Sequence, residues 1–213
     1  MTIRRKRFLG LYILMLFLEL IVATIILKRF GFDFYQNGDS PGYMTIARNL
    51  VEHEAFSFDN ASPYTPTNFR TPGYPLFLAL IYLVFHSFLP AMFLGALISA
   101  FAAPLVYLIA REIFSEKIAV TAGFLSAIEP LGLFLGVSIL TEGIFTPVLF
   151  LFTLCFIKYL KGSNFSYLWY SAVLLAIATL IRPIMFYFWP FAIPFIVYKA
   201  RDLKWRRVLK MAS

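Results

Sequence analysis

Long apolar runs alternate with short polar ones along most of the chain, and this pattern predicts membrane-spanning helices. The first run, Phe8 to Leu27, has about 20 residues, enough for an α-helix to cross the apolar core of a bilayer. Further runs follow at residues 74–89, 91–110, 118–136, 139–157, 167–181 and 184–198. We therefore predict an all-α fold, a polytopic bundle of transmembrane helices.

One long polar segment interrupts these runs between Arg29 and Thr71. It carries five of the 11 acidic residues, namely Asp33, Asp39, Glu52, Glu54 and Asp59. Ser40 and Pro41 are typical of an N-cap and a first helical turn. Apolar residues then recur at helical spacing, at Tyr43, Ile46, Ala47, Leu50 and Val51. We predict that residues 29–73 form the first loop outside the cytoplasm, with an amphipathic helix at the membrane interface.

Composition and charge support a membrane location. With 61% hydrophobic and 14% charged residues and a mean hydropathy of +0.79, the chain has too little polar surface for a soluble globular protein. Ten of the 19 basic residues lie in two clusters, Arg4 to Arg7 and Lys199 to Lys210. Such clusters beside apolar helices face the cytoplasmic leaflet. The net charge of +8 therefore indicates a multi-pass protein of the cytoplasmic membrane with a cytoplasmic N-terminus, and no nucleic-acid partner.

The number of crossings is constrained by the two basic ends. If both are cytoplasmic the number is even, whereas seven apolar runs are present. One run should therefore not cross, and 74–89 or its neighbour is the best candidate, because the segment leading to Pro90 is a poor aqueous loop. Counting back from the basic tail places Glu142 and Arg182 near the outer face.

Isolated polar residues give little chemistry by themselves. Cys155 is the single cysteine, so no intramolecular disulfide can form. His53 and His86 are too isolated for a zinc motif, and we predict no metal ligands. Glu19, inside the first apolar run, is expected to make a hydrogen bond between packed helices. Glu129, followed by Pro130, is expected to mark a break in a helix.

Four stretches in order carry a family resemblance: GDSPGYMTIARNL, FRTPGYPLFLALIY, ILTEGIFTPVLFL and LIRPIMFYFWP. Together they resemble the N-terminal half of the GT-C glycosyltransferases, most closely the protein mannosyltransferase and ArnT-like group of glycosyltransferase family 39. The resemblance implies one GT-C-like transmembrane domain over residues 1–213. It also implies an inverting hexosyltransferase that moves a sugar from a polyprenyl-phosphate donor to a glycan, lipid or protein acceptor on the outer face. A divalent metal and a second transferase chain stay open.

The resemblance also implies roles for particular residues. Asp39 matches the acid of the first outer loop on which catalysis depends, and Tyr43 and Ala47 complete the D-x-x-x-Y-x-x-x-A spacing. We expect the Asp39 carboxylate to take the proton from the acceptor hydroxyl. Arg70 and Arg182 are expected to bind the donor phosphate, since a guanidinium offers a planar fork of donors. Tyr43 and Glu142 are expected to support them.

Other readings of the same residues stay open. Asp39 can simply complement the N-terminus of a helix, and Arg182 can reach to the interface as an ordinary flanking arginine. Ser40 stands where family members often have a second acid. The family usually continues for several more helices, so we expect a fragment, a short homologue or one part of a split enzyme. The alternative function is a non-catalytic membrane subunit or scaffold that binds lipid-linked sugar.

Overall fold

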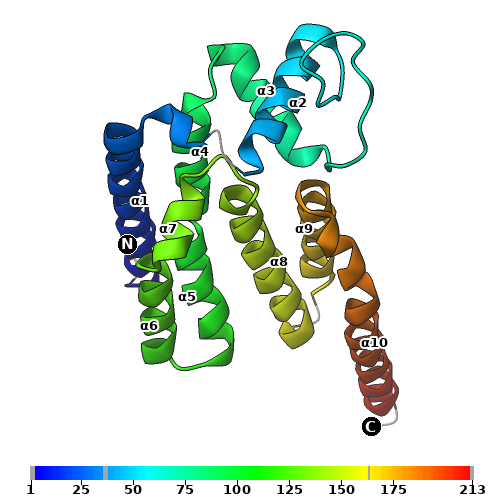
Figure 1. The fold of residues 1–213 in the computed structure, drawn as a ribbon. Helices are drawn as coiled ribbons and strands as arrows, with labels where there is room; N and C mark the ends of the chain where they lie inside the picture. The colour runs from blue at the N-terminus through cyan, green and yellow to red at the C-terminus, as the bar shows by residue number, and fades with distance from the viewer. Residues whose placement is uncertain (1–2, 36–37, 163, 212–213) are drawn as a thin grey trace.

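Every regular element in the computed structural model is a helix, within the residues it describes, 3–35, 38–162 and 164–211 (Figure 1). The all-α prediction is confirmed. In chain order the elements are α1 (Ile3–Phe30), η1 (Phe32–Tyr35), α2 (Ser40–His53), α3 (Gly73–Phe85), α4 (Leu89–Ser99), α5 (Ala102–Ile113), α6 (Glu116–Ala127), α7 (Pro130–Gly136), α8 (Glu142–Gly162), α9 (Phe165–Ile181), η2 (Pro183–Phe188) and α10 (Trp189–Met211).

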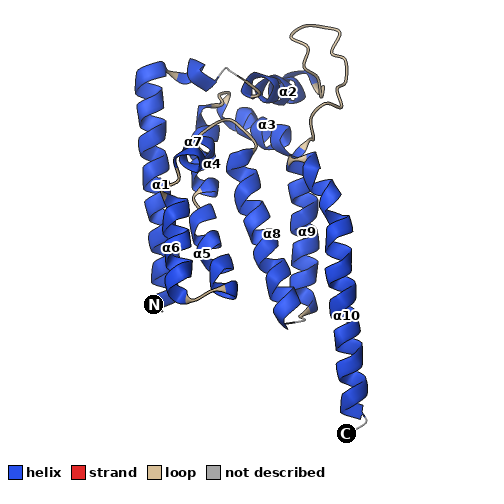
Figure 2. Cartoon of the chain, turned by 60° about the horizontal axis from the view of Figure 1, so that its bottom comes forward, coloured by secondary structure: helices blue, strands red, loops and turns tan. Residues whose placement is uncertain are grey.

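Three of these helices are long and apolar enough to cross a membrane. They are α1, the continuous stretch Leu89–Ile113 formed by α4 and α5, and α8. The bent pair of α6 and α7 makes a fourth if it counts as one span. The helices α9 and α10 run beside α8 and carry shorter apolar segments (Figure 2). The chain is therefore a multi-pass membrane protein, as its hydropathy indicates.

The break between α6 and α7 lies where the sequence predicted one. The two helix axes differ by 57°. Pro130 opens α7, and Glu129 occupies its N-cap, where the carboxylate accepts hydrogen bonds from the backbone N–H groups of Leu131 (2.9 Å) and Gly132 (2.5 Å). The carboxylate therefore satisfies donors that the bend leaves free.

Helix α3 lies with α2 at one end of the bundle, near the start of α8 and the end of α9 (Figures 1 and 2). It has 13 residues, about 20 Å at the usual rise per residue. The apolar core of a bilayer is about 30 Å thick. Of the two runs predicted as the one that does not cross, 74–89 thus forms the shorter helix, whereas its neighbour lies in the 25-residue stretch Leu89–Ile113.

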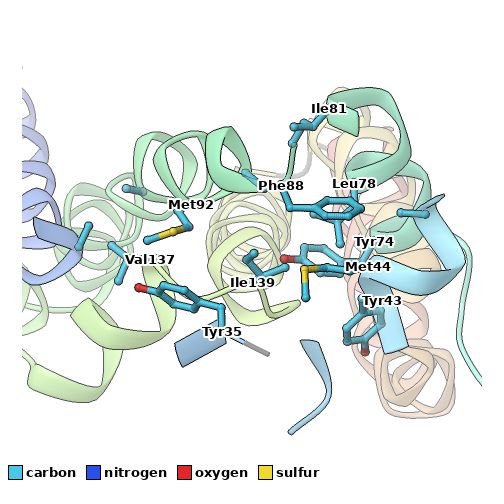
Figure 3. Close-up of a cluster of buried hydrophobic side chains, with 14 of the residues drawn as sticks. Tyr35, Tyr43, Met44, Tyr74, Leu78, Ile81, Phe88, Met92, Val137 and Ile139 are labelled. Carbon is cyan, nitrogen blue, oxygen red and sulfur yellow. The ribbon is translucent and has the colours of Figure 1, made fainter. Parts of the chain in front are cut away.

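A cluster of buried side chains fastens α2 and α3 to the bundle. Figure 3 shows residues of α2, α3, α4 and the segment after α7 meeting there. The predicted apolar face of α2 is inside: Ile46 and Ala47 are fully buried. Tyr43 lies at the edge of the cluster, with its ring edge-on to Tyr74 at 5.0 Å between centroids and its hydroxyl directed away. The cluster therefore holds Tyr43 in place while its polar end stays available.

Glu19 is fully buried in α1, where it packs against Ser99 of α4 and Gly136 of α7. Any side chain at position 136 would overlap the Glu19 carboxyl group, so only glycine suits this contact. The expected packing contact is present. Ser99, whose hydroxyl lies beside the Glu19 carboxyl group, is the partner that the expected hydrogen bond requires.

The loop between α2 and α3 is closed by Asp59. Its carboxylate accepts hydrogen bonds from the Ser57 hydroxyl (3.1 Å) and from the Thr65 N–H (2.7 Å) and hydroxyl. The Asn49 side chain donates to the carbonyls of Ser57 (2.9 Å) and Asp59 (2.8 Å). The bonds from Thr65, and then from Ser57, lower the pKa of Asp59.

These bonds make the loop sensitive to acid. Because the folded loop lowers the pKa of Asp59, its stabilising effect is present above the ordinary value of about 4 and is lost as the pH falls through the lowered pKa. We expect the protection of the amides of residues 55–67, measured against their intrinsic hydrogen-exchange rates at each pH, to fall in that acidic range. In Asp59→Asn, exchange should be fast already at neutral pH.

Glu54→Gln is the control, because it removes a neighbouring carboxylate of the same segment. Its exchange should follow the wild type. An Asp59→Asn loop as protected as the wild type at neutral pH would show that the carboxylate does not hold the loop.

Candidate functional site

Asp39 occupies the N-cap position of α2, which begins at Ser40. The prediction that Ser40 is the N-cap is therefore wrong by one residue. The Asp39 side chain makes no capping hydrogen bond, which argues against the reading that it merely complements the helix. Its side chain is 59% exposed, so solvent and ligands can reach the carboxylate.

The Asp39 carboxylate instead meets Arg70, which lies 31 residues later in the chain. Arg70 Nη2 donates to Asp39 Oδ1 at 2.5 Å, and Nη1 donates to Oδ2 at 3.3 Å. Each carboxylate oxygen thus accepts from one of the two terminal nitrogens of the same guanidinium. This forked geometry is the strong form of an arginine-carboxylate pair.

Tyr43 and Phe69 complete the surroundings of Arg70. Its Nη1 also donates to the Tyr43 hydroxyl oxygen at 3.3 Å, and its guanidinium lies 4.7 Å from the Tyr43 ring centre and 5.1 Å from that of Phe69. Partial burial lowers the pKa of Arg70, but the bond to Asp39 and the nearby Tyr43 outweigh it, and the net shift is upward. The arginine therefore stays a cation.

Tyr43 has a proton to offer. Its oxygen accepts from Arg70, which leaves its own O–H free to donate to a third group. Burial raises the pKa of Tyr43, so the hydroxyl stays protonated. Tyr43 can therefore support an anion next to Arg70.

A second ion pair lies on α8 and the end of α9. Arg182 follows the last residue of α9 and adopts an extended backbone before Pro183, which cannot continue the helix. Its Nη1 donates to Glu142 Oε1 at 2.8 Å. Glu142 opens α8, and its other oxygen accepts from the Thr141 hydroxyl at 3.1 Å. The expectation that Glu142 supports an arginine thus has a geometric basis, with Arg182 as that arginine.

The two ion pairs line one cavity of about 440 Å³. It lies at the α2 end of the bundle, between the loop before α3 and the junction of α9 with η2. Asp39, Tyr43, Arg70, Glu142 and Arg182, the five residues predicted for the site, all line it. Ala47 does not, because it is buried in the core.

The cavity is electrically balanced, with two carboxylates matched by two guanidiniums. An anionic group that enters must compete with Asp39 or Glu142 for an arginine. Where it does so, it sets a carboxylate free beside itself. Among the residues that the structure describes, no group of three or more His, Cys, Asp or Glu side chains is placed to hold a metal ion.

The lining residues that sequence reasoning missed include Phe69, Thr71 and Thr141. Each is directly adjacent in sequence to a predicted residue, Arg70 or Glu142. Their position next to a predicted residue was the signal that could have found them. Their residue types are ordinary where a chain enters a membrane, so they offered no reason to use that signal.

Comparison with known proteins covers most of the chain. The family model described as dolichyl-phosphate-mannose-protein mannosyltransferase matches residues 69–212. This range includes Arg70, Glu142 and Arg182 and leaves Asp39 and Tyr43 outside. No curated protein and no solved structure matches the chain.

Proposed function

Because the chain belongs to the dolichyl-phosphate-mannose-protein mannosyltransferase family of GT-C membrane glycosyltransferases, we propose that it transfers a sugar from a polyprenyl-phosphate donor to an acceptor hydroxyl. One observation carries the proposal: a single cavity holds an accessible carboxylate and two guanidiniums, drawn from segments far apart in the sequence. Sugar transfer from a polyprenyl-phosphate donor needs both kinds of group: a base to take the proton of the acceptor and cations to bind the phosphate.

The reaction is a single displacement. The acceptor oxygen attacks the anomeric carbon, and the bond from that carbon to the phosphate oxygen breaks, with the electron pair leaving on the phosphate. Asp39 takes the acceptor proton as the new bond forms. Attack on one face without a covalent sugar intermediate inverts the anomeric centre. Arg70 and Arg182 stabilise the charge that develops on the leaving phosphate.

Donor binding also prepares the base. In the free protein, the fork of Arg70 occupies both oxygens of Asp39. A donor phosphate also offers two oxygens to that fork, and as Arg70 turns to it, an Asp39 oxygen becomes free for the acceptor. The Tyr43 hydroxyl, which keeps its proton, then donates a hydrogen bond to the same phosphate. The base is thus released only when a donor is present.

We place the α2 end of the bundle outside the cytoplasm. The basic N-terminal cluster on α1 lies at the opposite end of that helix from the loop that carries Asp39. With the cluster inside, the loop is outside. The cavity then sits at headgroup level, where a donor with its tail in the bilayer presents its phosphate.

A donor-release assay tests this function. Purified protein in liposomes is incubated with polyprenyl-phosphate mannose and, separately, a short glycoside, a hydroxylated lipid or a serine-containing peptide. We expect one acceptor to trigger release of polyprenyl phosphate and to carry the mannose with inverted configuration. Donor binding without release in any mixture would point to the non-catalytic subunit instead. Absence of donor binding would contradict both functions.

A further inference from the structure

The two halves of the cavity come from parts of the chain that are far apart. Asp39 and Arg70 belong to the segment around α2, whereas Glu142 and Arg182 belong to α8 and the end of α9. A donor phosphate that contacts both arginines requires a fixed spacing between them. The contact that fixes this spacing is therefore part of the site.

That contact joins the residues next to the two arginines. The Thr71 hydroxyl donates to the carbonyl of Ile181 at 2.9 Å. Thr71 directly follows Arg70, and Ile181 directly precedes Arg182. The last carbonyls of a helix lack partners within the helix, and the Thr71 hydroxyl caps one of them from a distant segment.

Backbone packing at Gly73 reinforces the same junction. A Cβ atom at this position would lie 2.6 Å from the carbonyl oxygen of Leu180 and 2.8 Å from its carbon. Such a distance is too short for any side chain, and the obstructing atoms are rigid backbone. The start of α3 can therefore lie this close to the end of α9 only because residue 73 is glycine.

We propose that Thr71, seated by the close approach at Gly73, is a positioning residue that sets the spacing of Arg70 and Arg182 for the donor phosphate. This inference rests on the proposed function. Thr71 does not need to touch the reacting atoms. It acts because a rotation of either neighbouring backbone displaces a guanidinium from the cavity.

The test compares Thr71→Val, which removes the hydroxyl at nearly constant volume, with Thr71→Ser, which keeps it. In Thr71→Val, we expect the KM for polyprenyl-phosphate mannose to rise about fivefold and kcat/KM to fall about tenfold, since small misplacements of binding groups have large effects. Thr71→Ser should restore both values. A partial loss of folded protein would lower the maximal rate without raising KM, so the two effects are separable.

Thr153→Val is the matched control. It also removes a threonine hydroxyl bound to a backbone carbonyl, that of Leu149 at 2.8 Å, but within α8 and away from the cavity. We expect wild-type kinetics for it. If Thr71→Val also behaves as the wild type while Asp39→Asn is inactive, the positioning role is wrong and the proposed function stands. If Asp39→Asn is active, the proposed function itself fails.

A measurement independent of activity reports the junction directly. Spin labels at positions 68 and 184, both exposed, with Cys155 replaced by alanine, measure the distance across it. We expect a narrow distribution in the otherwise unchanged protein and in Thr71→Ser, a broader one in Thr71→Val, and a shifted mean in Gly73→Ala. An unchanged distribution in both Thr71→Val and Gly73→Ala would overturn the inference.

Discussion

Asp39→Asn is expected to slow sugar transfer by about 10²- to 10⁴-fold, the usual contribution of a general base. Asparagine has the shape of aspartate and can still accept from Arg70 through its one oxygen, so the cavity should keep its form. It cannot take a proton from the acceptor hydroxyl. The rate of polyprenyl phosphate release measures the effect, and the donor affinity should not fall, because the arginines are unchanged.

Glu52→Gln is the control for this substitution. Glu52 lies on the same helix, and its carboxylate accepts a hydrogen bond from the Tyr82 hydroxyl at 2.6 Å. It does not line the cavity with Asp39. We expect its transfer rate to be close to that of the wild type. Retained transfer in Asp39→Asn would remove Asp39 from the mechanism.

Arg182→Gln is expected to lower kcat/KM for the donor by about 10- to 100-fold. The reason is that a charge-assisted hydrogen bond is worth about 1.5–3 kcal/mol and each 1.4 kcal/mol is a factor of ten. The variant also leaves Glu142, whose side chain is only 28% exposed, without its cation. The free carboxylate then repels the phosphate. Transfer rates measured over a range of donor concentrations should show the change as a higher KM together with a lower kcat.

Arg111→Gln separates this effect from the general loss of an arginine. Arg111 pairs with Glu116 at 2.8 Å, the same distance as the pair of Arg182 with Glu142. It lies near the turn between α5 and α6, at the far end of the bundle from α2 (Figure 1). We expect its donor kinetics to match the wild type. Equal losses in the two variants would mean that Arg182 has no special relation to the donor.

The all-helical fold and the approximate positions of the helices could be predicted from the sequence, because the hydropathy of a segment depends only on the residues within it. An apolar run as long as Phe8 to Leu27 is favourable in a bilayer as a spanning helix, and the structure has α1 there. The break at Glu129 and Pro130 follows from the missing N–H of proline. The buried face of α2 follows from the spacing of Tyr43, Ile46 and Ala47.

The pairing of site residues needed the three-dimensional fold. A predicted carboxylate and a predicted arginine can each stand at a membrane interface without meeting. What joins Asp39 to Arg70 is the packing of α2 on α3, and what places Arg182 opposite them is the contact of Thr71 with Ile181. These contacts span 31 and 110 residues. No local pattern encodes such distances.

The most direct test of the central claim is a structure of the protein bound to a polyprenyl-phosphonate sugar that cannot be cleaved. We expect phosphonate oxygens within about 2.7–3.2 Å of the guanidinium nitrogens of Arg70 and Arg182. We also expect at least one Asp39 oxygen to be released from Arg70 and turned to the sugar. A phosphonate bound elsewhere, with the Asp39 and Arg70 fork intact and the cavity free of ligand, would contradict the account.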